Sequence, residues 1–126
     1  MRRYPQPRQT NPNRNMASST EFRDHVLGLL LPMGPVRARG MFGGFGIFMD
    51  DVMFALIAGD TLFLKIDSGN KDDFRNAGSR PFTYEGKKRP VEMSYYSAPE
   101  GTMEDAAKLL PWAESALAAA KRAKKN

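Results

Sequence analysis

The stretch of sequence that decides the fold is 43–66, which reads GGFGIFMDDVMFALIAGDTLFLKI. It contains three apolar runs, and two polar residues separate each run from the next. Short apolar runs joined by two-residue turns are typical of antiparallel β-hairpins. We therefore predict three consecutive antiparallel strands. The runs lie at 43–49, 52–58 and 61–66, and the turns are Asp50-Asp51 and Gly59-Asp60.

Two-residue turns also predict which strand residues share a face of the sheet. They place Met49 opposite Val52 and Leu56 opposite Phe63, and side chains alternate between the faces along each strand. The expected helix-covered face is uncharged and contains Gly44, Gly46, Phe48, Met53, Ala55, Ile57, Leu62, Leu64 and Ile66. The expected second face contains Phe45, Ile47, Met49, Val52, Phe54, Leu56, Thr61, Phe63 and Lys65. We expect the C-terminal helix or a second copy of the chain to cover this second face.

A helix is predicted before these strands. Residues 18–21 (SSTE) offer a capping box, in which a serine hydroxyl and Glu21 satisfy the first free N–H groups. Apolar residues then recur at helical spacing, and Pro32 and Gly34-Pro35 end the pattern. These apolar residues are Phe22, Val26, Leu29, Leu30 and Met33. His25 lies at the edge of this face, and residues 36–41 are a possible further strand.

The second half of the chain alternates helical and strand patterns. Residues 70–77 predict a two-turn helix with Gly78 at its C-terminal cap. Alternating apolar residues on both sides of a basic tip, Lys87-Lys88-Arg89, predict a hairpin. Thr102 is expected to cap a helical stretch, and Pro111 to begin a new helical segment, because proline suits a first turn. The apolar face of that segment contains Trp112, Ala113, Ala116, Leu117 and Ala120.

The sequence therefore predicts an α+β fold in two layers. It has a mainly antiparallel sheet of about five strands and three or four helices, in the order α-β(3)-α-β(2)-α. The expected organisation is a disordered basic tail at 1–15, one folded domain at 16–123 and a basic end at 124–126.

Composition excludes several kinds of catalytic and metal site. The 126 residues contain no cysteine and one histidine, which excludes disulfides, thiol catalysis and sites of several histidines. The glycines at 40–46 lack the Lys-Ser/Thr of a phosphate-binding loop and the following helix of a dinucleotide site. We expect no enzyme activity, no cofactor and no metal. No apolar run is long enough for a membrane span, so we expect no membrane association and a cytoplasmic protein.

The positive charge is concentrated at the two ends of the chain. The net charge is +5, and residues 1–15 and 121–125 contribute +4 each, which leaves −3 for the body at 16–120. An acidic body argues against a nucleic-acid-binding face on the folded domain, although basic ends can attract phosphate.

Several segments resemble, in the same order along the chain, the N-terminal domain of the TfoX/Sxy family. They are 39–48 with the turn Asp50-Asp51 and 52–57, then 61–65, 81–84, 93–96 with Pro99-Glu100, and 109–113. Family members commonly have Asp-Gly at the turn, where this chain has Asp51. The regulators of this family also carry a C-terminal helical domain, which the sequence up to Asn126 does not resemble; we expect a stand-alone N-terminal domain. The resemblance implies an α+β fold and, by analogy, a link to the regulation of DNA-uptake competence and transcription.

Two functions follow from these observations as alternatives. The first is a non-catalytic regulatory or protein-interaction domain, with an unknown protein partner or a homodimer. Its candidate surface contains Arg37, Arg39, Phe45, Phe54, Phe63, Lys65 and Tyr95. The second is a nucleic-acid-associated protein that acts through its basic ends, with Lys87, Lys88 and Arg89 as candidate phosphate contacts.

Overall fold

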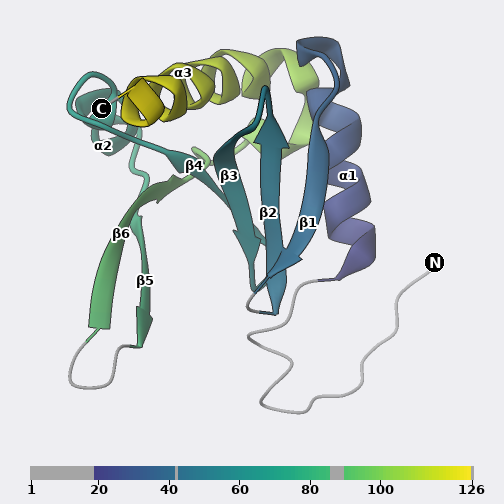
Figure 1. Ribbon diagram of the computed structural model, residues 1–126, viewed down its shortest axis with the longest axis horizontal. Coiled ribbons are helices and arrows are strands. Elements are labelled where there is room, and N and C mark those ends of the chain that lie inside the picture. Colours follow the sequence, from purple (N-terminus) through teal and green to yellow (C-terminus); the bar gives the residue numbers. More distant parts are fainter. Residues whose placement is uncertain (1–18, 42, 86–89, 126) are drawn as a thin grey trace.

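The computed structural model describes residues 19–41, 43–85 and 90–125, and the tail at 1–15 lies outside this part. Within it the fold is α+β: a six-stranded antiparallel sheet of order β1-β2-β3-β4-β6-β5 with three α-helices (Figure 1). The strands are β1 Arg37–Met41, β2 Gly44–Met49, β3 Val52–Ala58, β4 Thr61–Lys65, β5 Pro81–Glu85 and β6 Pro90–Ser97. The helices are α1 Thr20–Leu30, α2 Lys71–Asn76 and α3 Ala106–Lys125, with 3₁₀ turns at Leu31–Met33 and Thr102–Glu104. The fold class is confirmed, and β1 is the further strand that residues 36–41 indicated.

The two predicted turns are confirmed. Asp50 and Asp51 have φ of 54° and 64°, and Gly59 and Asp60 have φ of 58° and 57°. Positive φ at both central residues defines a type I′ turn, whose twist matches that of the strands it joins. Three of these four residues are aspartates in a conformation that glycine adopts without strain.

The predicted register holds next to both turns but fails between β2 and β3 farther from their turn. Met49 lies opposite Val52, Phe48 opposite Met53 and Leu56 opposite Phe63, as the turn lengths predict. Ile47, however, lies opposite Ala55 and not opposite Phe54. Phe54 is therefore an extra residue of β3 with no partner in β2, which makes a β-bulge. Turn lengths alone do not reveal a bulge, and beyond it the side chains of β2 point to the face opposite to the one predicted.

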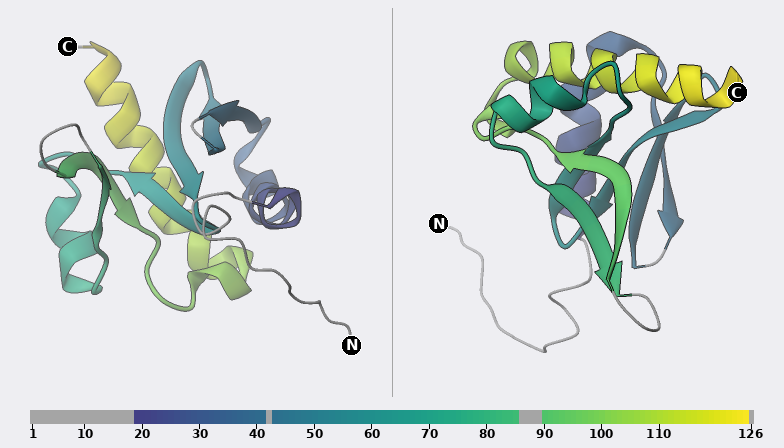
Figure 2. Two further views of the ribbon diagram at one scale, coloured as in Figure 1. Left: turned by 90° about the horizontal axis from the view of Figure 1, so that it is seen from below. Right: turned by 90° about the vertical axis from the view of Figure 1, so that its left-hand side faces the viewer.

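The bulge changes which residues the helices cover. The hydrophobic core lies between the helices and one face of the sheet (Figure 2), and Phe45, Ile47 and Phe54 belong to this helix-covered face. Gly46, Phe48 and Met53, expected among the helices, lie instead on the opposite face, which we call the open face. Ala55, Ile57, Leu62 and Leu64 are on the helix-covered face, as predicted.

Helix α1 begins at the predicted serine cap. The Ser19 hydroxyl accepts a hydrogen bond from the Phe22 amide at 3.0 Å. Since Phe22 occupies the third helical position, Glu21 cannot complete the predicted capping box. Val26 and Leu30 are fully buried, which confirms the apolar face, and the exposed His25 ring is 2.8 Å from the Met103 carbonyl oxygen.

Helix α3 is continuous through Pro111, so the prediction of a new segment at this residue is wrong. The helix begins after Asp105, whose carboxylate accepts a hydrogen bond from the Ala107 amide at 2.9 Å. Thr102 lies instead in the 3₁₀ turn and donates to the Pro99 carbonyl at 2.6 Å. The small residues Ala113, Ala116 and Ala120 are buried and permit close approach of α3 to the sheet. Helix α3 packs on β3 and β4 and beside α1, so it does not cover the open face (Figures 1 and 2).

The second predicted hairpin is confirmed as β5 and β6, whose tip, Lys87-Lys88-Arg89, lies outside the described residues. Between the two hairpins, α2 contributes the fully buried Phe74, and its chain turns away at Gly78 with φ of 86°.

Candidate interaction surface

The open face of the sheet is the candidate functional surface, because none of the described helices packs on it. Among the side chains that the structure describes, its apolar residues come from all six strands, and none of them belongs to the core between sheet and helices. They are Met41, Phe48, Met53, Leu56, Phe63, Phe82, Met93 and Tyr95. Leu56 and Tyr95 are nearly buried among their neighbours, and the other six are partly exposed. The face is therefore apolar but well packed.

Three side chains converge over Gly46 near one end of this face. A Cβ atom at Gly46 would lie 2.7 Å from the Met53 sulfur and 3.1 Å from carbon atoms of Met41 and Phe48. The absence of a side chain at Gly46 therefore lets two flexible methionines and a phenylalanine pack against the strand itself. Methionine-rich surfaces adapt readily to different partners.

Basic residues lie over the aromatic rings of the same face. The guanidinium carbons of Arg37 and Arg39 are 5.9 Å and 6.0 Å from the centre of the Phe48 ring. The Lys65 ammonium is 5.2 Å from the centre of the Tyr95 ring. These are cation–π distances, and they hold the charged groups against the face.

The far end of the face is an aromatic pair and a buried tyrosine. The rings of Phe63 and Phe82 are 4.9 Å apart and tilted by 58°, which joins β4 to β5. The Tyr95 hydroxyl donates to the Met53 carbonyl at 3.4 Å. Burial raises the pKa of Tyr95 to about 12, because a buried phenolate would lose its hydration. Tyr95 is therefore a neutral structural residue of this face at physiological pH.

Five of the seven predicted surface residues lie on the open face: Arg37, Arg39, Phe63, Lys65 and Tyr95. The other two predictions are wrong. Phe54 is fully buried in the core, because the bulge turns it towards the helices, and Phe45 packs partly buried on the same side, beneath Arg23. The analysis of the sequence missed Phe48 and Met53, and only the unpredicted bulge places them on this face.

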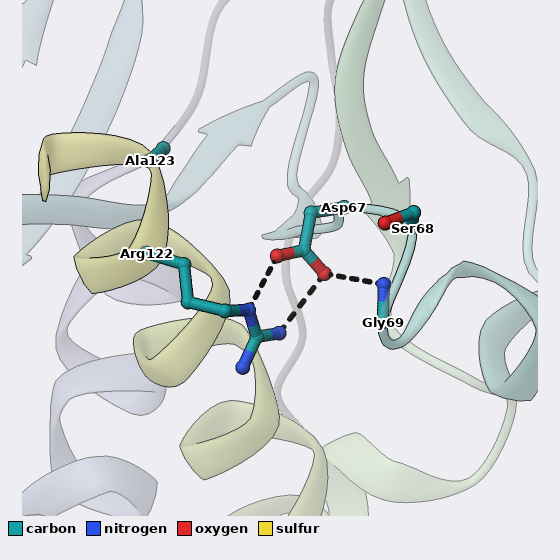
Figure 3. A pocket seen from close by; sticks show the side chains of 5 residues that line it. All are labelled: Asp67, Ser68, Gly69, Arg122 and Ala123. Carbon is teal, nitrogen blue, oxygen red and sulfur yellow. Dashed lines mark hydrogen bonds and ion pairs between the residues drawn. The ribbon is translucent and has the colours of Figure 1, made fainter. Parts of the chain in front are cut away.

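The second feature is a shallow pocket between the β4–α2 connection and the end of α3 (Figure 3). Arg122 binds Asp67 with two hydrogen bonds, Nε to Oδ2 at 2.6 Å and Nη2 to Oδ1 at 2.9 Å, and the Gly69 amide donates to Oδ1 at 2.9 Å. The hydrogen bonds from Arg122 hold the pKa of Asp67 below its usual value, against a smaller opposing effect of burial. The carboxylate and the guanidinium are hydrogen-bonded to each other. We therefore interpret the pocket as a structural contact that links α3 to the β4–α2 connection.

The buried Asn70 also links the β4–α2 connection to α3. Its side-chain oxygen accepts from the Asp67 amide at 2.8 Å. Its amide group donates to the Lys65 carbonyl at 3.2 Å and to the Ser115 hydroxyl at 3.1 Å. The sequence places Asn70 at a helix start, but its contact with Ser115, 45 residues away, leaves no local signal.

The basic C-terminal end is partly used in ion pairs. Besides Arg122 with Asp67, the Lys121 ammonium lies 2.8 Å from the Asp50 carboxylate at the first turn. Two of the basic residues that could contact phosphate thus stabilise the fold.

Neither a metal site nor a membrane span is found in the described ranges. No three His, Cys, Asp or Glu residues there are grouped to hold a metal ion. None of the helices described is long and apolar enough to cross a membrane.

Comparison with known proteins supports the sequence resemblance. A search of curated proteins finds no match. Residues 28–120, which run from α1 almost to the end of α3, match the family described as TfoX N-terminal domain. Since this match spans well over half of the sequence and covers all six strands, the chain belongs to the TfoX N-terminal domain family.

Proposed function

We propose that this chain is a non-catalytic protein-interaction domain with a regulatory role in the cytoplasm, and that it binds its partner through the open face. The observation that carries the proposal is a sheet face that none of the described helices covers, and on which the side chains described include eight apolar or aromatic and three basic ones. Aromatic, methionine and arginine side chains are enriched in the centres of protein interfaces. By analogy with the family, we propose that this binding regulates transcription or competence.

The contacts of the polar groups support a binding role over a catalytic one. Within the described residues, His25 is exposed and directed at a backbone carbonyl, and the Asp67 carboxylate is saturated by Arg122 and Gly69. A general base needs a free lone pair near a substrate site. Neither group offers one beside the open face.

Site-specific photocrosslinking in the source cells tests the proposal. A photoreactive phenylalanine analogue replaces Phe63 on the open face, and a matched control carries it at Lys108, an exposed residue of α3. We expect a discrete protein adduct from position 63 and none from position 108. Adducts from position 108 alone, or equally from both, contradict the proposal.

The alternative is association with nucleic acid through the basic ends, and the charge distribution of the sequence is its support. Binding to random duplex DNA, measured from low to high salt, distinguishes the two functions. Tail-driven binding weakens steeply with salt and persists when Phe63 is replaced, whereas binding through the open face requires Phe63.

A further inference from the structure

The open face differs in charge from the rest of the body. Among strand residues whose side chains are described, the charged ones on this face are Arg37, Arg39 and Lys65, all basic. The body at 16–120 nevertheless has a net charge of −3, and many of its acidic residues lie in turns and connections, such as Asp50, Asp60 and Asp67. An acidic partner would therefore be attracted to the basic groups of the open face.

Two of these basic groups form a regular pair. Arg37 and Arg39 are two residues apart on the edge strand β1, so they project from the same face roughly 6.6 Å apart along the strand. Both guanidinium groups lie over the Phe48 ring, which restricts their motion. Arg37 has one long contact, 3.8 Å to the Asp51 carboxylate, and both of these side chains are largely exposed. An exposed pair of this length contributes little, so a ligand carboxylate can replace it.

We propose that the open face recognises an extended acidic segment of a partner protein, with carboxylates at alternate positions against Arg37 and Arg39. This inference rests on the proposed function and specifies the partner. In an extended chain, residues at i and i+2 have the same spacing and the same orientation as the arginine pair. Each guanidinium can hold one carboxylate through two hydrogen bonds. An apolar side chain of the segment then packs against the methionines above Gly46.

Two other occupants fit the face less well. A second copy of the chain would bring Arg37, Arg39 and Lys65 against an identical basic face, on which no described strand side chain carries a carboxylate. Single-stranded nucleic acid is held by basic groups along its backbone together with aromatic rings on which its bases stack. Here cations already lie over the rings of Phe48 and Tyr95, and Phe63 packs against Phe82.

Binding of two synthetic peptides tests the inference. Both are nonapeptides with blocked ends and the same composition of glutamate and valine. In one the two residues alternate, and in the other they follow the order EEVVEEVVE, in which no two glutamates are two positions apart. We expect the alternating peptide to bind more tightly, with amide shift changes centred on β1 and β2. Arg37→Gln with Arg39→Gln should weaken its binding on the order of tenfold for each arginine lost. The matched control, Arg75→Gln with Lys108→Gln, removes two exposed charges from the helices and should leave binding unchanged.

Several results would overturn the inference. They are equal binding of the two peptides, binding that survives loss of both arginines, and preferential binding of a thymidine decanucleotide at the same residues. A fourth such result is a dimer, detected by sedimentation, that the Arg37→Gln, Arg39→Gln variant abolishes. Photocrosslinking separates this failure from that of the proposed function. If position 63 still yields its protein adduct in the Arg37→Gln, Arg39→Gln variant, the inference fails and the proposed function stands.

Discussion

Replacement of Asn70 by alanine should be among the most destabilising changes of a polar residue in this domain. Asn70 is 3% exposed, and its side chain accepts from the Asp67 amide and donates to Lys65 and Ser115. Each net hydrogen bond contributes about 1 kcal/mol, and each buried group left without a partner costs about 1–3 kcal/mol. Because water can reach some of these groups near the surface, we expect the free energy of unfolding to fall by about 3 kcal/mol.

Urea unfolding followed by circular dichroism measures this loss. The matched control is Asn76→Ala, at an exposed position at the end of α2, which should change stability by less than about 0.5 kcal/mol. A double-mutant cycle with Ser115→Ala isolates the link to α3 and should give a coupling of about 1 kcal/mol. If Asn70→Ala is no more destabilising than Asn76→Ala, the hydrogen-bond network assigned to Asn70 is wrong.

Three further predictions concern the turn, the tryptophan and the buried tyrosine. Asp51→Gly should stabilise the domain by about 1 kcal/mol in thermal unfolding, since it relieves a φ of 64° and loses only the exposed contact with Arg37. Asp51→Asn is the control, and an equal gain in that variant would contradict relief of backbone strain as the cause. Trp112→Ala should cost about 3 kcal/mol, because its partly buried ring packs edge-on against Phe74 at 4.9 Å; an unchanged melting temperature would place the ring outside the core. Tyr95 keeps its proton up to about pH 12 in the folded protein but only to about pH 10 in the unfolded chain. Its contribution to the free energy of unfolding is therefore full below pH 10 and falls by about 2–3 kcal/mol as the pH rises to 12. In Tyr95→Phe, this loss of stability between pH 10 and 12 should disappear.

The strands and turns were predictable because their signals are local. Asp50-Asp51 and Gly59-Asp60 separate apolar runs of strand length, and the structure places type I′ turns at both positions. The register near each turn follows directly from its length, as at Met49 and Val52.

The assignment of the open face was only partly predictable. The bulge at Phe54 occurs inside a continuous apolar run, VMFALIA, where no glycine or polar residue marks it. One extra residue reverses the faces of β2, so Phe48 replaces Phe45 on the open side. Tertiary packing overrides the regular alternation of the strand here, because the bulge brings both Phe54 and Ala55 into the core beneath the helices.

Pro111 is a second case in which tertiary packing prevails over a local signal. Proline disfavours a helix interior because it removes a hydrogen bond and crowds the preceding turn. The buried residues Leu109 and Ala113 on either side anchor one continuous helix across this position. The exposed Pro111 lies on the solvent side, where its lost hydrogen bond is more easily replaced by water.

The central claim is that the open face is the binding surface, and the solvent exposure of methyl groups tests it most directly. In the free protein, a soluble paramagnetic probe should broaden the methyl signals of Met41 and Met53 and spare those of Ile47 and Ile57. Addition of the partner captured at position 63 should protect Met41 and Met53 and leave exposed helix-layer methyls such as that of Ala118 unchanged. If the partner instead protects Ala118 while Met53 stays accessible, the binding surface lies on the helices and the account is wrong.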